Sequence, residues 1–296
     1  MSIKTACLIL ASGDKYQKIG KVAADSFKKW HPDVDLYFIN NENEKDYFSY
    51  DVIKVVGLGI FKFVHAAEIM KLKKYDKIIL LGSDTITCSR LDEFMDNNHD
   101  DFLVTLDYPY QFNSARISSP DDETHLNADV ICFNNVKVIY DMVRIAHFHK
   151  PSGMAEQGGV NEIAWSNTYD YSFSIVDGPY QTSKVVYNAR AKGDMCLPYQ
   201  YQDYSQYTGR PPKYPAYEKP WAGPLGEFYV EGDKLFTGDG KQIKVWHYCD
   251  GFGALDIPTY EKLVNNYISN WFNKDTKSFF KQHCAAEDFF EKDFFV

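Results

Sequence analysis

The carboxylate of Asp84 follows a short apolar run at a point where α/β proteins commonly bind ligands. Residues Lys77–Leu81 are predicted to form a buried strand, and only Gly82 and Ser83 separate it from the aspartate. In an open α/β sheet, ligands bind just beyond the carboxyl ends of the strands. A carboxylate there, beside two small residues, can hold a divalent metal that carries a phosphorylated ligand. The same pattern also fits an aspartate that stabilises a turn, and the local sequence leaves both interpretations open.

The first hundred residues alternate predicted strands with predicted helices. Apolar runs bounded by glycine, proline or polar residues indicate the strands, and apolar residues at helical spacing indicate the helices. The strands are 5–12, 35–40, 51–56 and 77–81, and the helices are 19–30 and 61–73. This alternation predicts an α/β fold with a mostly parallel sheet and helices on both faces.

Later in the chain the predicted pattern becomes mixed. The expected elements are strands at 102–106 and 130–133, helices at 136–149 and 155–165, and a β-meander over 226–248. A polar surface loop is expected at 108–122, and a long ordered loop rich in proline and tyrosine at 196–226. We therefore divide the chain into a domain over 1–257 and a C-terminal helical extension over 258–296 that packs on it.

Composition narrows the function classes. The formal net charge of −9 argues against a generic polyanion binder, because phosphate backbones are bound by basic surfaces, so we do not expect nucleic acid as a partner. The segment Met1–Thr5 leads directly into a strand pattern without the apolar run of a signal peptide. No apolar run approaches the roughly 20 residues of a membrane span. Six scattered cysteines without a C-x-x-C pair favour reduced thiols. We expect a cytoplasmic protein.

The common phosphate-binding motifs do not occur in this sequence. There is neither a G-x-x-x-x-G-K-[ST] loop nor a strand-linked G-x-G-x-x-G, and no G-x-S-x-G elbow. An α/β protein of this kind must hold a phosphorylated ligand by another device. A divalent metal bound to carboxylates is the natural candidate.

Six short motifs occur in one order along the chain. They are Leu8–Tyr16, Phe61–Phe63, Leu81–Thr85, Leu126–Val130, Ala155–Asn161 and Val245–Tyr248. This order resembles that of the glycogenin-like and bacterial lipopolysaccharide glucosyl- and galactosyltransferases, which are nucleotide-sugar transferases. The resemblance implies the GT-A fold, a Rossmann-like, mixed and mostly parallel sheet flanked by helices.

The resemblance also implies which residues bind the donor. The first strand and loop would hold the nucleoside, with Ala11 and Ser12 beside it and Tyr16 packed on the base. Lys62 would reach the donor from its helix, and Ser83 lies next to the metal position. Outside the resemblance, Tyr16 can equally pack on the first helix, and Lys62 can be a solvated lysine.

Asp84 and His247 are the metal ligands that the resemblance implies, with Mn²⁺ or Mg²⁺ as the ion. The first aspartate of the D-x-D motif is Gly82 here, so diphosphate oxygens and water would complete the coordination. We expect weak metal binding without the nucleotide, and a metal-independent enzyme is the alternative. His247 also fits a hydrogen-bonded structural histidine at the end of an amphipathic strand.

Several polar residues are candidates for contact with the reacting sugar carbon. These catalytic candidates are Asp107, Asn127, Asp129, Glu156 and Gln157. Asp107 and Asp129 border strands and can either face the cleft or form turns. Glu156 and Gln157 equally suit a helix start, where the helix dipole favours negative charge. Asp129 stands where the family prefers a small residue, which predicts an altered sugar pocket.

The combined prediction is a hexosyltransferase that uses a nucleoside-diphosphate sugar, most simply a UDP-sugar, and a hydroxyl acceptor on a glycan, a lipid-linked glycan or a protein. A sugar-nucleotide pyrophosphorylase is one alternative. A catalytically silent nucleotide- or carbohydrate-binding protein is another, because the first D-x-D aspartate is missing. The phenylalanine-rich C-terminus suggests a docked helix or a homodimer surface.

Overall fold

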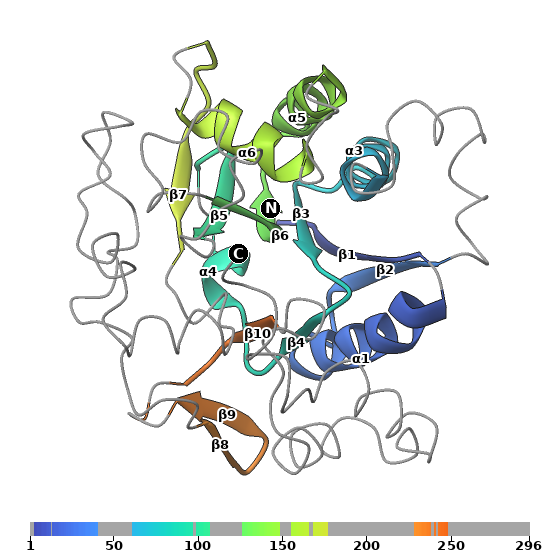
Figure 1. Cartoon of the computed structure of the whole chain (residues 1–296), viewed down its shortest axis with the longest axis vertical. Coiled ribbons are helices and arrows are strands. Elements are labelled where there is room, and N and C mark those ends of the chain that lie inside the picture. Colours follow the sequence, from blue (N-terminus) through green and yellow to red (C-terminus); the bar gives the residue numbers. More distant parts are fainter. Residues whose placement is uncertain are drawn as a thin grey trace, which may run out of the picture.

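A computed structural model describes the predicted sheet and the helices around it (Figure 1). The described residues are 3–12, 14–40, 61–96, 99–106, 126–148, 155–165, 168–176, 228–237, 240 and 242–247. The predicted strand 51–56, the loops 108–122 and 196–226, and the extension 258–296 lie outside them. The division into a domain and an extension, and a dimer surface on that extension, therefore stay predictions.

The central sheet has six strands in the order β2-β1-β3-β6-β5-β7. They are β1 (Thr5–Ala11), β2 (Asp35–Asn40), β3 (Lys77–Leu81), β5 (Phe102–Leu106), β6 (Leu126–Phe133) and β7 (Phe173–Ile175). β1 runs parallel to β2 and β3, and β5 runs parallel to β7, whereas β6 is antiparallel to both of its neighbours. The sheet is mixed and mostly parallel, which confirms the predicted fold class.

Helices cover both faces of this sheet, with α3, α5 and α6 on one face and α1 on the other (Figure 1). The helices are α1 (Asp14–Trp30), α3 (Phe61–Lys73), α4 (Asp92–Met95), α5 (Val136–Phe148) and α6 (Ala155–Trp165). Alternate strand residues enter the two cores: Leu80 packs in the core that contains α3 and α5, and Ile79 in the core that contains α1. Every residue of β3 is buried, which fits the apolar run Ile78–Leu81, and the buried ammonium of Lys77 donates to backbone carbonyl oxygens of Phe94 and Asp96.

A small second sheet lies next to α1. Its strands, β4 (Thr85–Thr87) and β10 (Val245–His247), are antiparallel, with His247 opposite Thr85. All three residues of each strand are buried. This pairing brings a late segment of the chain to the carboxyl end of β3.

The predicted meander over 226–248 is only partly correct. β8 (Phe228–Glu231) and β9 (Lys234–Thr237) form the expected hairpin. β10 does not continue it as a third strand. Among the residues described after the hairpin, 240 and 242–247, Gln242 forms an isolated bridge with Phe236. Trp246 explains the difference, because pairing β10 with β4 leaves this large side chain fully buried, and an exposed hairpin edge would leave it in water.

Two short strands were absent from the sequence prediction. β4 and β7 have three residues each, which is too short for a periodic pattern to reveal. The cysteines in the described ranges, Cys7, Cys88 and Cys132, are buried and free, as expected for reduced core thiols. None of the helices in these ranges combines the length and the apolar character that a membrane crossing requires.

Candidate active site

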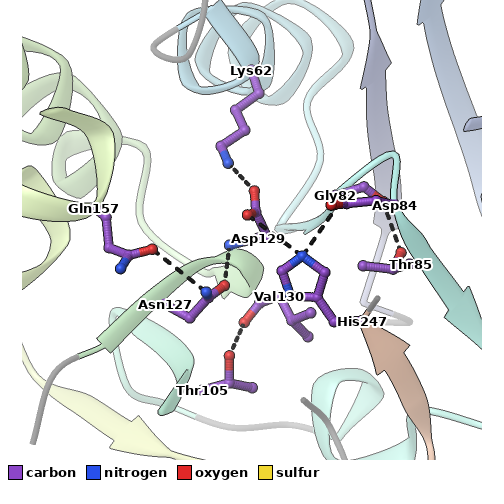
Figure 2. Close-up of polar contacts among 10 residues, drawn as sticks. All are labelled: Lys62, Gly82, Asp84, Thr85, Thr105, Asn127, Asp129, Val130, Gln157 and His247. Atoms are coloured by element: carbon purple, nitrogen blue, oxygen red, sulfur yellow. Dashed lines mark hydrogen bonds and ion pairs between the residues drawn. The ribbon is translucent and has the colours of Figure 1, made fainter. Parts of the chain in front are cut away.

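The turn after β3 places Asp84 beside His247 (Figure 2). The hydroxyl of Thr85 closes this turn by donating to the carbonyl oxygen of Gly82 at 2.8 Å. β4 then pairs with β10, so that His247 lies opposite Thr85. As a result, Nε2 of His247 is 3.3 Å from Oδ1 of Asp84, and the two side chains are only 5% and 15% exposed. The structure thus brings the two predicted metal ligands together from distant parts of the chain.

A bulge in β6 directs Asp129 toward the same point. The register between β5 and β6 shifts next to Thr105, and its hydroxyl donates to the carbonyl oxygen of Val130 at 3.0 Å. The backbone N–H of Asp129 donates to Oδ1 of Asn127 at 2.6 Å. The carbonyl oxygen of Asp129 accepts a hydrogen bond from the backbone N–H of Gly82 at 2.7 Å. Bulges commonly re-aim a side chain, and here the carboxylate faces the end of β3 (Figure 2).

The two carboxylate oxygens of Asp129 have different partners. Oδ1 accepts a hydrogen bond from the ammonium of Lys62 on α3, and Oδ2 lies 3.9 Å from Nε2 of His247. Burial alone would lower the pKa of Lys62, but the charge of Asp129, aided by Glu156 and Asp84, raises it above its ordinary value. Lys62 therefore carries a positive charge at the centre of the site.

An amide network connects β6 to α6. Nδ2 of Asn127 lies 3.5 Å from Oε1 of Gln157, at the outer limit of a hydrogen bond, and both side chains are buried. The side chain of Asn161 accepts the N–H of Leu126 at 2.9 Å and donates to its carbonyl oxygen at 3.0 Å. It thereby pairs with the first residue of β6 as a neighbouring strand would. These bonds hold the catalytic candidates on β6 and α6 in one place.

Two of the predicted donor-binding residues, Ala11 at the end of β1 and Ser83 after β3, lie close to the same point of α1. Gly20 of α1 lies close to both residues, because a Cβ built on it would lie 2.7 Å from Cβ of Ala11 and 3.4 Å from Cβ of Ser83. The helix, the end of β1 and the turn after β3 therefore touch there. Ser12 directly follows Ala11 in sequence, and Tyr16 lies in the first turn of α1. Both side chains are partly buried.

Of the two remaining catalytic candidates, Glu156 is within the described residues and Asp107 is not. Glu156 is partly buried in the first turn of α6, where its charge acts on Lys62. Asp107 lies outside the described residues, so its catalytic role stays a prediction.

A divalent metal suits the donor atoms of this site. Carboxylate oxygens and an imidazole nitrogen are good ligands for Mn²⁺, and two adjacent ligands on one octahedral ion lie about 3 Å apart. The 3.3 Å between Asp84 and His247 fits such a pair. Across the described ranges, no three His, Cys, Asp or Glu side chains are already arranged to hold a metal. Asp84 and His247 would therefore be two ligands of such an ion, and a bound diphosphate would add its own oxygens.

Comparison with solved structures identifies the fold. The galactosyltransferase LgtC, solved in complex with donor and acceptor sugar analogs, matches over 93% of this chain and 99% of its own chain, with a TM-score of 0.53 at 14% sequence identity. This chain has the GT-A glycosyltransferase fold. No family model matches the sequence, and no curated protein does. The specific glycogenin-like family is therefore not established.

Two further solved structures resemble this GT-A chain less closely. The bifunctional glycosyltransferase WbbM is 12% identical, and the match covers 95% of this chain and 52% of that one with a TM-score of 0.49. The glycosyltransferase GlyE of Streptococcus pneumoniae TIGR4 is 15% identical, with 65% and 51% covered and a TM-score of 0.44. These scores are too low to carry an argument.

Sequence reasoning assigned Lys62 and Asp129 separate roles and missed that they form an ion pair within the GT-A site. The two residues are 67 positions apart in sequence and lie on a helix and a strand that face one another only in the folded chain. Their opposite charges were the one available signal. Neither local periodicity nor motif spacing could have joined them.

Proposed function

We propose that this protein transfers a hexose from a nucleoside-diphosphate sugar, with uridine as the favoured nucleoside, to a hydroxyl acceptor. The meeting of Asp84 and His247 at the carboxyl end of β3 carries the proposal. In an α/β sheet this edge is where ligands bind. The fold is shared with a galactosyltransferase solved with donor and acceptor sugar analogs, and this likeness supports the same class of substrate here.

A divalent metal held by Asp84 and His247 would act as a Lewis acid on the diphosphate, and so make the nucleotide a better leaving group. Lys62 would add a second positive charge, because its ammonium points into the site from α3. Asn127 and Gln157 are buried and fixed by the amide network, so they would present amide groups to sugar hydroxyls with little loss of side-chain entropy.

Hydrolysis of UDP-sugars and binding of UDP with Mn²⁺ test this proposal together. Wild-type protein should slowly release UDP from at least one UDP-sugar, because water replaces an absent acceptor. Asp84→Asn and His247→Gln should each lower that rate at least about 100-fold, which corresponds to roughly 3 kcal/mol of lost stabilisation of the leaving group. Asp170→Asn, at an exposed aspartate, is the matched control.

The two alternatives predict different results in the same experiment. A silent binding protein would bind UDP and Mn²⁺ but release no UDP from a panel of nucleotide sugars. A pyrophosphorylase would form UDP-sugar from UTP and a sugar phosphate. Full hydrolytic activity in folded Asp84→Asn protein would remove the aspartate from the mechanism and contradict the proposal.

A further inference from the structure

A side chain at position 82 would meet the side chains of both Asp84 and Asp129. A Cβ built on Gly82 would lie 2.9 Å from Oδ1 of Asp84, 3.1 Å from Cβ of Asp129 and 3.4 Å from Cγ of Asp129. The glycines with positive φ in the described ranges are Gly232 and Gly240, so the backbone at Gly82 does not itself require glycine. A larger residue at position 82 would therefore require both Asp84 and Asp129 to shift.

Asp84 and Asp129 both face Nε2 of His247. The distances from this nitrogen are 3.3 Å to Oδ1 of Asp84 and 3.9 Å to Oδ2 of Asp129. On one octahedral Mg²⁺ or Mn²⁺, adjacent ligands lie about 3 Å apart and opposite ligands about 4 Å apart. Both separations fall within this range.

Lys62 already engages one oxygen of the Asp129 carboxylate. Its ammonium is bonded to Oδ1 of Asp129 and so holds this carboxylate by a charge-assisted hydrogen bond. The Lys62 side chain is 14% exposed and that of Asp129 is 31% exposed, so the pair is only partly shielded from water. A divalent ion beside His247 would meet the other oxygen, Oδ2, and its charge would repel the ammonium and weaken the hold of the carboxylate on Lys62.

We infer that Asp129 is a third metal ligand, relocated from position 82 to β6, and that it exchanges Lys62 for the ion when the donor nucleotide binds. The inference rests on the proposed function, because that function supplies the metal and the diphosphate. The released ammonium of Lys62 then faces the negatively charged donor. Gly82 and Asp129 act as a matched pair, in which the glycine makes room for the carboxylate.

Titration of Mn²⁺ into the UDP-bound protein tests the exchange without any turnover. Free Mn²⁺ is followed by its electron paramagnetic resonance signal, and complex formation by calorimetry. Asp129→Asn keeps the shape of the side chain but removes its charge, and it should weaken Mn²⁺ binding more than about tenfold, because ligand charge sets the affinity of such sites. Asp170→Asn should leave the affinity unchanged. Equal affinity of the Asp129→Asn and wild-type proteins would overturn the inference.

A positional exchange provides a second test. Gly82→Asp alone should destabilise the protein or fail to improve Mn²⁺ binding, because its Cβ meets Asp129. The double variant Gly82→Asp with Asp129→Gly should recover Mn²⁺ affinity to within about threefold of wild type, since the carboxylate returns to the same space. A folded double variant that binds no better than Asp129→Gly would overturn the inference, and if it does not fold, the Asp129→Asn titration decides.

Lys62 variants test the competition directly. Without nucleotide, Lys62→Met should bind Mn²⁺ several-fold more tightly than Lys62→Arg, which keeps the positive charge on the carboxylate. Equal affinities would overturn the exchange. Wild-type protein that binds UDP equally well with and without Mn²⁺ would also overturn it. Hydrolysis of a nucleotide sugar that depends on Asp84 would still support the proposed transferase, so the two failures can be told apart.

Discussion

Two buried histidines should make the fold sensitive to mild acid. His31 follows α1 and is 2% exposed, and its Nε2 accepts the backbone N–H of Leu91 at 3.0 Å. Burial, aided by the charge of Arg90, lowers its pKa from 6.5 to about 4. Burial also lowers the pKa of His65, on α3, from 6.5 to about 4. Both histidines are therefore neutral in the folded protein at neutral pH.

The sign of the effect follows from which state binds the proton first. As the pH falls below 6.5, the unfolded chain protonates these histidines while the folded chain does not, so stability is lost between about pH 6.5 and pH 4. At about pH 5 the loss is about 2 kcal/mol for each histidine, or about 4 kcal/mol for both. This is a large part of the 5–15 kcal/mol that typically holds a protein folded.

Urea unfolding at about pH 7.5 and about pH 5 measures this loss, because the extrapolated free energies are compared directly. His31→Gln and His65→Gln should each reduce the difference between the two pH values by about 2 kcal/mol. His99→Gln, at an exposed histidine, is the matched control and should leave it unchanged. If neither His31→Gln nor His65→Gln alters the difference in unfolding free energy between the two pH values, these histidines do not take up protons on unfolding.

Three further predictions concern the packing and the ligands of the site. Asn161→Leu should lower the free energy of unfolding by about 3 kcal/mol in urea, because it leaves the buried N–H and carbonyl group of Leu126 without the hydrogen bonds to Asn161. A loss below about 1 kcal/mol would show that these two backbone groups bond to other partners in the variant. Gly20→Val should cost about 1–3 kcal/mol, since its Cβ would lie 2.7 Å from that of Ala11, and an unchanged melting temperature would mean that α1 moves aside freely. Removal of divalent metal with EDTA should weaken UDP binding at least about tenfold by calorimetry, and undiminished binding would favour a metal-independent site.

Elements whose sequence pattern is local were predicted well. The strand Lys77–Leu81 and the helix Phe61–Lys73 have the predicted bounds, because the signals that mark them are local: the apolar run Ile78–Leu81 lies within the strand, and the break Gly57–Gly59 precedes the helix. The structure places β10 against β4, where the sequence predicted a meander, since the choice of a partner strand depends on residues far away in the chain.

The candidate site divides in the same way. The sequence pointed to Asp84 and His247 through the order of the motifs, and their contact required the pairing of β4 with β10. The bulge that turns Asp129 toward Gly82 has no local signature, because its cause is the register between β5 and β6. The roles of these residues in binding and catalysis stay predictions.

The pairing of β4 with β10 also has a consequence for biosynthesis. More than half of the chain lies between Thr85 and His247, so their contact closes one of the longest loops in the molecule. Contacts between such distant segments form slowly, and domains fold as their segments leave the ribosome. The central sheet can assemble early around β3, but a nascent chain can bring His247 to Asp84 only after residue 247 has left the ribosome.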